Sequence, residues 1–156
     1  MKFTHLDSAG QARMVDVTDK QPTKRAATAS ATVVCDPEIL RRIASGEMPK
    51  GDVLAVARIA GIAAAKRTPE LLPLAHVIGV HGAAVDLTLG PESIEVVATV
   101  RTADRTGVEM EALTAASVAA LALIDMVKGL DRNAYIREVK LLAKEGGRSG
   151  RWRRDA

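Results

Sequence analysis

The alternation of apolar and polar positions predicts four strands along the chain. Residues 23–35 alternate and are rich in β-branched side chains, which is typical of a strand. Alternation returns over residues 85–89 and 94–102 on either side of a Gly-Pro turn, so we expect an antiparallel hairpin there. A last strand is predicted over residues 135–144.

Two helices are predicted between the first strand and the hairpin. Asp36 as N-cap and Pro37 at the first helical position begin a short helix that ends at Gly46. A second helix is predicted over residues 53–66, which are rich in alanine, with Asp52 as its N-cap. Both helices therefore have recognisable start signals.

The longest predicted helix covers about residues 107–130, and we expect Thr106 and Glu109 to form a capping box at its start. The order of elements is then strand, two helices, hairpin, helix, strand. Adjacent strands with segregated helices indicate an α+β fold, in which helices pack on one face of an antiparallel sheet. The ferredoxin-like β-α-β-β-α-β arrangement fits this order best.

The length of 156 residues favours one domain. We divide the chain into an N-terminal arm (1–20), a single ferredoxin-like catalytic domain (21–146) and a basic, flexible C-terminal tail (147–156). Much of the net charge of +3 comes from four tail arginines at positions 148, 151, 153 and 154. The tail is interpreted either as solvated and disordered or as an arm that contacts anions.

The composition argues against several classes of protein. The only aromatic residues are Phe3, Tyr135 and Trp152, and the part before the tail is close to neutral, so a nucleic-acid binder is disfavoured. The lone Cys35 excludes an internal disulfide and fits a reducing compartment. We expect neither a signal peptide nor a run of about 18 apolar residues that spans a membrane, and hence a cytoplasmic protein.

Charged residues at both ends of the longest helix are candidates for chemistry. Asp125 lies near the C-terminal end, where a carboxylate meets the negative end of the macrodipole. Lys128 either offsets this as a surface ion pair or forms an acid–base pair with Asp125 in a pocket. At the other end Glu111 points about 200° away from Glu109, so the two cannot share one cap and one is left for a ligand.

Other candidates carry weaker signals. Lys50 precedes the second helix, where free N–H groups and an ammonium favour phosphate, although Lys-Gly-Asp is also a common exposed turn. His76 ends an apolar stretch, so its ring needs a partner or a cavity, whereas His5 and His81 carry no such signal. We find no metal-ligand spacing and no glycine-rich phosphate loop, and expect no metal site.

Six segments of the chain together match the pattern of one family. They are MVDV (14–17), KGDV (50–53), ARIAGIAAAKRT (57–68), PLAH (73–76), TGVEMEALTAASVAALALIDMVK (106–128) and LAKEGGRSG (142–150). With these segments the chain resembles the cyclic pyranopterin monophosphate synthase family. The resemblance covers about residues 4–152, nearly the whole chain, and its longest motif is highly specific.

This resemblance implies a lyase of molybdenum cofactor biosynthesis. It would convert a 3′,8-cyclised 7,8-dihydro-GTP, made upstream from GTP by a radical enzyme, to cyclic pyranopterin monophosphate and release pyrophosphate. The resemblance also implies a homohexamer, a trimer of dimers, with its sites at the subunit interface. No tightly bound cofactor is expected, although magnesium could enter with the substrate triphosphate.

Carried onto this sequence, the resemblance makes Asp125 and Lys128 the catalytic acid–base pair. The substrate-binding positions fall on Lys50, Leu74, Ala75, His76, Glu109, Met110, Glu111 and Lys144. The family usually has cysteine where this chain has Ala75, so a thiol nucleophile is absent at that position. Two other interpretations stay open. One is a non-catalytic, nucleotide-binding ferredoxin-like regulatory module that would not need Asp125. The other is an RNA-binding domain that uses the tail, which the few aromatic residues disfavour.

Overall fold

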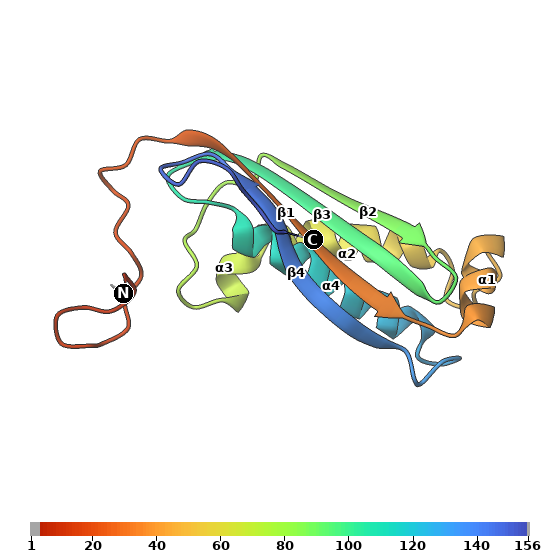
Figure 1. Ribbon diagram of the computed structural model, residues 1–156. Helices are drawn as coiled ribbons and strands as arrows, with labels where there is room; N and C mark the ends of the chain where they lie inside the picture. The colour runs from red at the N-terminus through yellow and green to blue at the C-terminus, as the bar shows by residue number, and fades with distance from the viewer. Residues whose placement is uncertain (1–3, 156) are drawn as a thin grey trace.

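The computed structural model describes residues 4–155. The first three residues of the predicted arm, among them Phe3, lie outside this range, as does Ala156 of the predicted tail. Five strands form one sheet, and helices pack against it (Figure 1). The strands are β1 (Thr23–Val34), β2 (Gly82–Leu89), β3 (Ser93–Asp104), β4 (Tyr135–Glu145) and β5 (Trp152–Arg153). The helices are α1 (Pro37–Ser45), α2 (Val53–Lys66), α3 (Thr68–Leu71) and α4 (Glu109–Val127).

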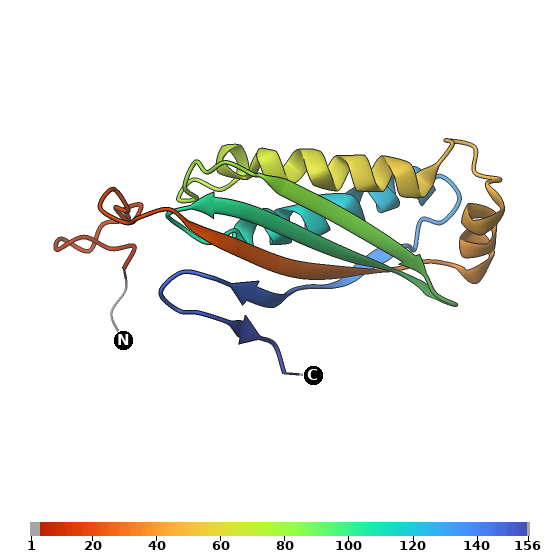
Figure 2. The same ribbon diagram turned by 90° about the horizontal axis from the view of Figure 1, so that it is seen from above.

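The sheet has the strand order β2-β3-β1-β4-β5, and every neighbouring pair is antiparallel. The central strand β1 pairs along one side with β3, where Ala29 is opposite Ala98, and along the other with β4, where Ala29 is opposite Leu141. Helices α2 and α4 lie along one face of the sheet (Figure 2). The predicted α+β, ferredoxin-like fold is therefore confirmed.

The core between sheet and helices is built from small side chains. On β1, Ala27, Ala29, Ala31 and Val33 alternate toward the helices and are almost fully buried. Six alanines of α4 and α2 contribute most of the opposite wall: Ala57, Ala112, Ala115, Ala116, Ala119 and Ala120. These short side chains let the two layers approach closely, and among residues 4–155 no aromatic side chain is part of this core.

The two major helices approach each other most closely at Gly61 of α2. A Cβ atom at this position would lie 2.8 Å from the carbonyl oxygen of Ala115 and 3.1 Å from the Cβ of Ala119. A real Cβ atom essentially never lies 2.8 Å from a backbone oxygen, so only glycine fits without a shift of α4. The spacing of α2 and α4 is thus set by backbone contact.

The first two helices begin as predicted. The Asp36 side chain accepts a hydrogen bond from the N–H of Glu38, and α1 ends at Gly46, whose φ of 74° places it in the left-handed region. The Asp52 side chain accepts one from the N–H of Ala55 at the start of α2. These local signals are strong enough that no tertiary contact overrides them.

The predicted capping box at the start of α4 is wrong. The helix begins at Glu109 after Val108 as N-cap, and no side chain caps it. Instead of turning back to Thr106, the Glu109 carboxylate folds over Gly107 and pairs with Lys144. The Glu109 carboxylate thus pairs with a fully charged ammonium across the fold in place of a neutral backbone N–H.

Helix α4 also departs from the expectation that no stretch could span a membrane. With 19 residues and a mean hydropathy of 1.7, it is long and apolar enough to do so by composition alone. In the fold, nine of its residues are buried, and the charged Glu111 is one of them. The core helix of a globular domain has this same composition, so its hydropathy is weak support for a membrane segment.

The C-terminal segment returns along the edge of the sheet. After β4, the chain turns at Gly146 and Gly147, and Trp152 then pairs with Lys144 of β4. The Nε of Arg154 donates to the Leu141 carbonyl oxygen at 2.7 Å. The sequence did not indicate this pairing of β5 with β4. The division of the chain into arm, domain and tail stays a prediction.

Candidate active site

A cavity of about 490 Å³ lies at the N-terminal end of α4 and brings six of the predicted site residues together. Three come from the segment that follows α3, and three come from the first turn of α4. They are Leu74, Ala75, His76, Glu109, Met110 and Glu111. Because the two segments are far apart in sequence, only the packing of the chain after α3 against α4 creates this site.

His76 is held in the cavity by the N-terminal arm. Its Nε2 lies 2.6 Å from the carbonyl oxygen of Val15. A carbonyl oxygen can only accept, so Nε2 carries a proton and donates to it. Val15 and Val17 also line the cavity. The arm therefore forms a wall of the site as well as orienting the imidazole.

Glu111 is the buried acid of the cavity, with only 3% of its surface exposed. Burial raises the pKa of Glu111 to about 7, a hydrogen bond with its own backbone lowers it, and the charge of Glu109 raises it further. A carboxyl group that titrates near neutrality can either donate or accept a proton under cellular conditions. This property could not be read from the sequence, because it depends on burial.

Lys144 of β4, which was also predicted to bind substrate, reaches the same end of α4. Its Nζ lies 2.8 Å from Oε1 of Glu109, and both side chains are mostly buried. The ion pair joins strand β4 to the first turn of α4. Lys144 is thus placed beside the cavity, with its charge held by a carboxylate of the same site.

A second cluster occupies the C-terminal end of α4. Nζ of Lys128 lies 2.7 Å from Oδ1 of Asp125, and Nζ of Lys50 lies 3.6 Å from Oδ2. Lys50 also donates to the Asp125 backbone oxygen at 2.6 Å, so it satisfies a helix-end carbonyl. The hydrogen bond from Lys128, its charge and then the charge of Lys50 lower the pKa of Asp125. The carboxylate is therefore ionised between two ammonium groups.

The structure separates the predicted site into these two clusters. Glu111 and Asp125 are 14 residues apart on one helix, which corresponds to about 21 Å along its axis. In one chain, Asp125 and Lys128 are each 60% exposed at the side chain, whereas the cavity at the other end is recessed. One chain therefore does not bring the acid–base pair and the cavity into contact.

Sequence reasoning missed three cationic residues near the cavity. Lys20, Arg25 and Arg148 line a neighbouring hollow that shares Glu109 with it. The sequence pointed to only one of the three, Arg148, because the basic tail was interpreted as a possible arm that contacts anions. Within residues 4–155, no three His, Cys, Asp or Glu side chains gather as a set of metal ligands, and the prediction about metals stays a prediction.

The fold and the two clusters define a ferredoxin-like domain whose longest helix carries an ion-paired aspartate at one end and a cavity with a buried carboxyl group at the other. The chain belongs to the MoaC family, which matches residues 14–147. A cyclic pyranopterin monophosphate synthase of Geobacter metallireducens is 57% identical over 157 residues, which cover 99% of this chain and 98% of that protein. Proteins of the same name from Streptomyces avermitilis and Chloroflexus aurantiacus are 54% and 56% identical.

Proposed function

We propose that this chain is an enzyme of molybdenum cofactor biosynthesis with cyclic pyranopterin monophosphate synthase activity. As a phosphorus–oxygen lyase, it would convert the 3′,8-cyclised 7,8-dihydro-GTP to cyclic pyranopterin monophosphate and release pyrophosphate. The observation that carries this proposal is the ionised Asp125 between Lys50 and Lys128, on a helix whose other end opens into the cavity. The names of the relatives support the same activity.

The residues of the two clusters suit the chemistry of this conversion. Rearrangement of the purine-derived ring requires repeated proton transfers, for which Asp125 with Lys128 can serve as base and acid. Glu111 adds a carboxyl group that can exchange protons near neutral pH, and the imidazole of His76 lines the same cavity. Loss of pyrophosphate places negative charge on the leaving oxygens, which lysines or a magnesium ion carried by the triphosphate would stabilise.

We further propose that two copies of the chain complete each site, within a hexamer that is a trimer of dimers. The separation of about 21 Å between Glu111 and Asp125 supports this arrangement, because one bound substrate would not reach both reacting groups in one chain. A second copy that covers the exposed acid–base pair would also desolvate it. The exposed apolar side chains of Ile59 on α2 and Leu121 on α4 favour association of the helical layer.

The remaining features of the proposal follow from the same chemistry. The ligand is a GTP-derived small molecule, and neither a nucleic acid nor a membrane is part of the function. No tightly bound cofactor is required, since the acid–base groups belong to the chain itself. A cytoplasmic location fits the single free thiol of Cys35.

Mixed oligomers test both the activity and the shared site. Asp125→Asn and Glu111→Gln chains are each expected to be inactive when pure, because every site lacks one cluster. After unfolding and refolding together, half of the random dimers hold one chain of each kind, and each of these has one intact site. Activity should return to about a quarter of the wild-type rate, measured as pyrophosphate released from the cyclised GTP.

The matched control mixes Asp125→Asn with Lys128→Ala, which change the same cluster. Every site then contains a defect whichever chains combine, so this mixture should stay inactive. Folded mixed oligomers that regain no activity in the first mixture would contradict the shared site. A wild-type protein that binds the cyclised GTP without releasing pyrophosphate would favour the regulatory module instead.

A further inference from the structure

The chain between α3 and β2, residues 72–81, forms one wall of the cavity although it contains no helix or strand. Residues 74–76 of this segment line the cavity. A site built on a loop is less precisely placed than one built on a helix or strand, unless contacts from a rigid element hold the loop. The contacts that hold this segment therefore decide how well its side chains are placed.

Strand β3 holds the segment at Gly79. Oγ1 of Thr102 donates to the Gly79 carbonyl oxygen at 2.5 Å, and Oδ2 of Asp104 accepts from the Gly79 N–H at 3.3 Å. The two β3 residues are two positions apart, so their side chains extend from the same face of the strand. In the described part of the chain, these are the only hydrogen bonds that the backbone of residues 76–80 makes.

Thr102 is the polar end of an apolar row. The side chains before it on the same face of β3 are all buried and apolar, namely Ile94, Val96, Ala98 and Val100. Thr102 is itself 4% exposed, so its hydroxyl group needs a partner within the fold. Valine would fill the same space without that requirement. The hydroxyl group therefore points to a role in holding the loop.

The single hydroxyl proton of Thr102 is directed to Gly79. The other neighbour of Oγ1 is Nδ1 of His81, at 3.2 Å. This nitrogen already accepts a hydrogen bond from the Ala103 N–H at 3.1 Å, and a backbone N–H can only donate. The Gly79 carbonyl oxygen, which is also the nearer of the two neighbours, is thus the acceptor of the hydroxyl proton.

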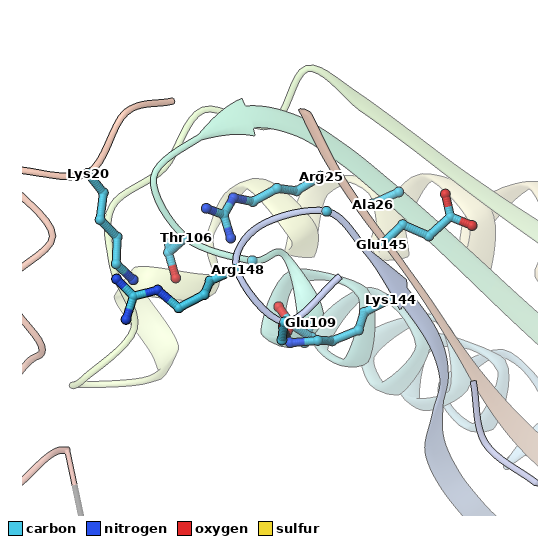
Figure 3. A pocket seen from close by; sticks show the side chains of 11 residues that line it. Lys20, Arg25, Ala26, Thr106, Glu109, Lys144, Glu145 and Arg148 are labelled. Atoms are coloured by element: carbon cyan, nitrogen blue, oxygen red, sulfur yellow. Dashed lines mark hydrogen bonds and ion pairs between the residues drawn. The ribbon is translucent and has the colours of Figure 1, made fainter. Parts of the chain in front are cut away.

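The carboxylate of Asp104 links two walls of the cavity. While Oδ2 holds Gly79, Oδ1 accepts from the Arg105 N–H at 2.7 Å. Arg105 begins the loop from β3 to α4, and Thr106 and Gly107 of this loop line the cavity. Figure 3 shows Thr106 on this loop, between the end of β3 and the start of α4. One side chain of β3 therefore contacts a loop on either side of the site.

These contacts are not needed to pair β2 with β3. The pairing begins with Gly82 opposite Arg101, and the His81 N–H already donates to the Arg101 carbonyl oxygen at 3.0 Å. Asp104 is held separately, because its own carbonyl oxygen accepts from Nε of Arg25 at 3.0 Å. The two β3 side chains thus act from a fixed strand on a segment that lies outside the sheet.

We propose that Thr102 and Asp104 are positioning residues, which fix Gly79 and thereby hold residues 74–76 in the geometry that binds the ligand. That this ligand is the cyclised GTP rests on the proposed function. Neither side chain lines the cavity, so each acts through the segment and not on the ligand. Their loss should weaken substrate binding more than it slows the proton transfers assigned to Asp125.

Steady-state kinetics of Thr102→Val test this role, because valine keeps the shape and removes the hydroxyl group. The KM for the cyclised GTP should rise about tenfold, since a displaced wall of the cavity loses contacts with the ligand. The kcat should change less than about twofold, as expected when binding is lost equally in the ground state and the transition state. Thr102→Ser retains the hydroxyl group and should keep KM within about twofold of the wild-type value.

The matched control is Thr99→Val, which removes a hydroxyl group from the same strand. Thr99 extends from the opposite face of β3, where its Oγ1 lies 3.1 Å from that of Thr28, and the substitution should leave KM unchanged. Equal rises in KM for Thr99→Val and Thr102→Val would contradict a specific role of Thr102. So would a KM that Thr102→Ser fails to restore.

Asp104→Asn provides a second variant that does not alter a buried position. Asparagine has one side-chain oxygen, so it cannot accept from both N–H groups as the carboxylate does. KM should rise here as well, whereas Asp86→Asn, which removes the same charge from an exposed position of β2, should leave KM unchanged. An unchanged KM in Asp104→Asn would remove Asp104 from the proposal.

Hydrogen exchange of the substrate-free protein separates this proposal from the proposed function. Peptides from residues 72–82 should exchange about tenfold faster in Thr102→Val and Asp104→Asn, and at the wild-type rate in Thr99→Val. Faster exchange with weaker binding of the cyclised GTP, in a protein that does not convert it, would retain the positioning role and reject the activity. Normal turnover with exchange and KM unchanged in both variants would retain the activity and reject the positioning role, as would faster exchange with an unchanged KM.

Discussion

Nζ of Lys144 and Oε1 of Glu109 lie 2.8 Å apart and join the sheet to the start of α4 at the boundary between two cavities. Glu109 is therefore placed to compensate Lys144 on one side and to act on buried Glu111 on the other, where its charge contributes to the raised pKa of Glu111. The pair connects the cationic hollow electrostatically to the acid of the cavity.

Replacing Glu109 by glutamine should lower the pKa of Glu111 toward its ordinary value. The substitution removes a negative charge that disfavours the ionised form of Glu111, while the burial that dominates the shift remains. Titration of ¹³C-labelled glutamate carboxyl groups by NMR measures this change directly. Glu92→Gln, on the exposed turn between β2 and β3, is the control and should leave the Glu111 titration in place. An unchanged midpoint in Glu109→Gln would show that the two carboxylates are not coupled.

The substitution Asp125→Asn should abolish product formation without unfolding the protein. If Asp125 with Lys128 transfers protons, the rate falls at least about 100-fold, the lower range for general acid–base catalysis. Lys128→Ala should be similarly damaging, and the double variant should be little worse, because groups that act as a unit are not additive. Single-turnover assays with the cyclised GTP measure these rates. A near-normal rate in Asp125→Asn would reduce the pair to a surface ion pair.

Glu111 should make stability fall as the pH rises from about 4.5 to about 7. Its pKa of about 7 in the folded state lies above the ordinary value of 4.5, so the folded protein holds this proton more tightly than the unfolded chain does. Above pH 7 the buried group must ionise, and the penalty is then fully present. Glu111→Gln should therefore raise the free energy of unfolding by about 1–2 kcal/mol at pH 8.5 and far less at pH 5. Urea unfolding at both pH values tests the sign.

Gly61→Ala should destabilise the protein, although alanine is the better helix former. On a free helix face, the exchange would stabilise by about 1 kcal/mol. Here the added methyl group meets the Ala115 carbonyl oxygen at 2.8 Å, and overpacking of this kind costs about 1–3 kcal/mol. Ala63→Val adds more volume on the exposed side of the same helix and should cost only the lower helix propensity of valine, about 0.5–0.7 kcal/mol. A stabilised Gly61→Ala protein in thermal unfolding would contradict the close helix contact.

The folded protein should resist alkylation by iodoacetamide and keep its activity. Cys35 is the only thiol in the sequence and is 4% exposed. Burial, followed by the charge of Asp131, raises the pKa of Cys35 to about 11, so almost no thiolate is present at pH 8. Mass spectrometry should show no modification in buffer and complete modification in guanidinium chloride. Loss of activity on treatment of the native protein would indicate an accessible thiol and overturn this prediction.

The order and type of the elements could be predicted from the sequence because the signals were local. The caps at Asp36 and Asp52 act within one helical turn. The alternation along β1 reflects apolar side chains on the face toward the helices and more polar ones on the opposite face. The start of α4 was predicted incorrectly for the same reason. The capping box is a local motif, whereas the partner that binds Glu109 is Lys144, 35 residues further along the chain.

The candidate site could be predicted only in part. The residues of the cavity were identified through the family resemblance, and the predicted helix already placed Glu111 and Asp125 at its opposite ends. Which side chains surround each end could not be predicted, because they come from segments far apart in the chain. Lys20 and Arg25 carried no signal, because an isolated cation in a sequence is ordinarily solvated. Their convergence depends on the return of the chain after β4, which no local pattern indicates.

The pairing of Trp152 with β4 gives the protein an intrinsic optical reporter. Trp152 is the only tryptophan, it is 39% exposed, and the guanidinium of Arg154 lies 5.6 Å from the centre of its ring. Emission from this indole therefore monitors the short β4–β5 ribbon and not the alanine-rich core. The spectrum would respond to any rearrangement of the loop between these strands, whereas melting of the interior has to be followed by circular dichroism.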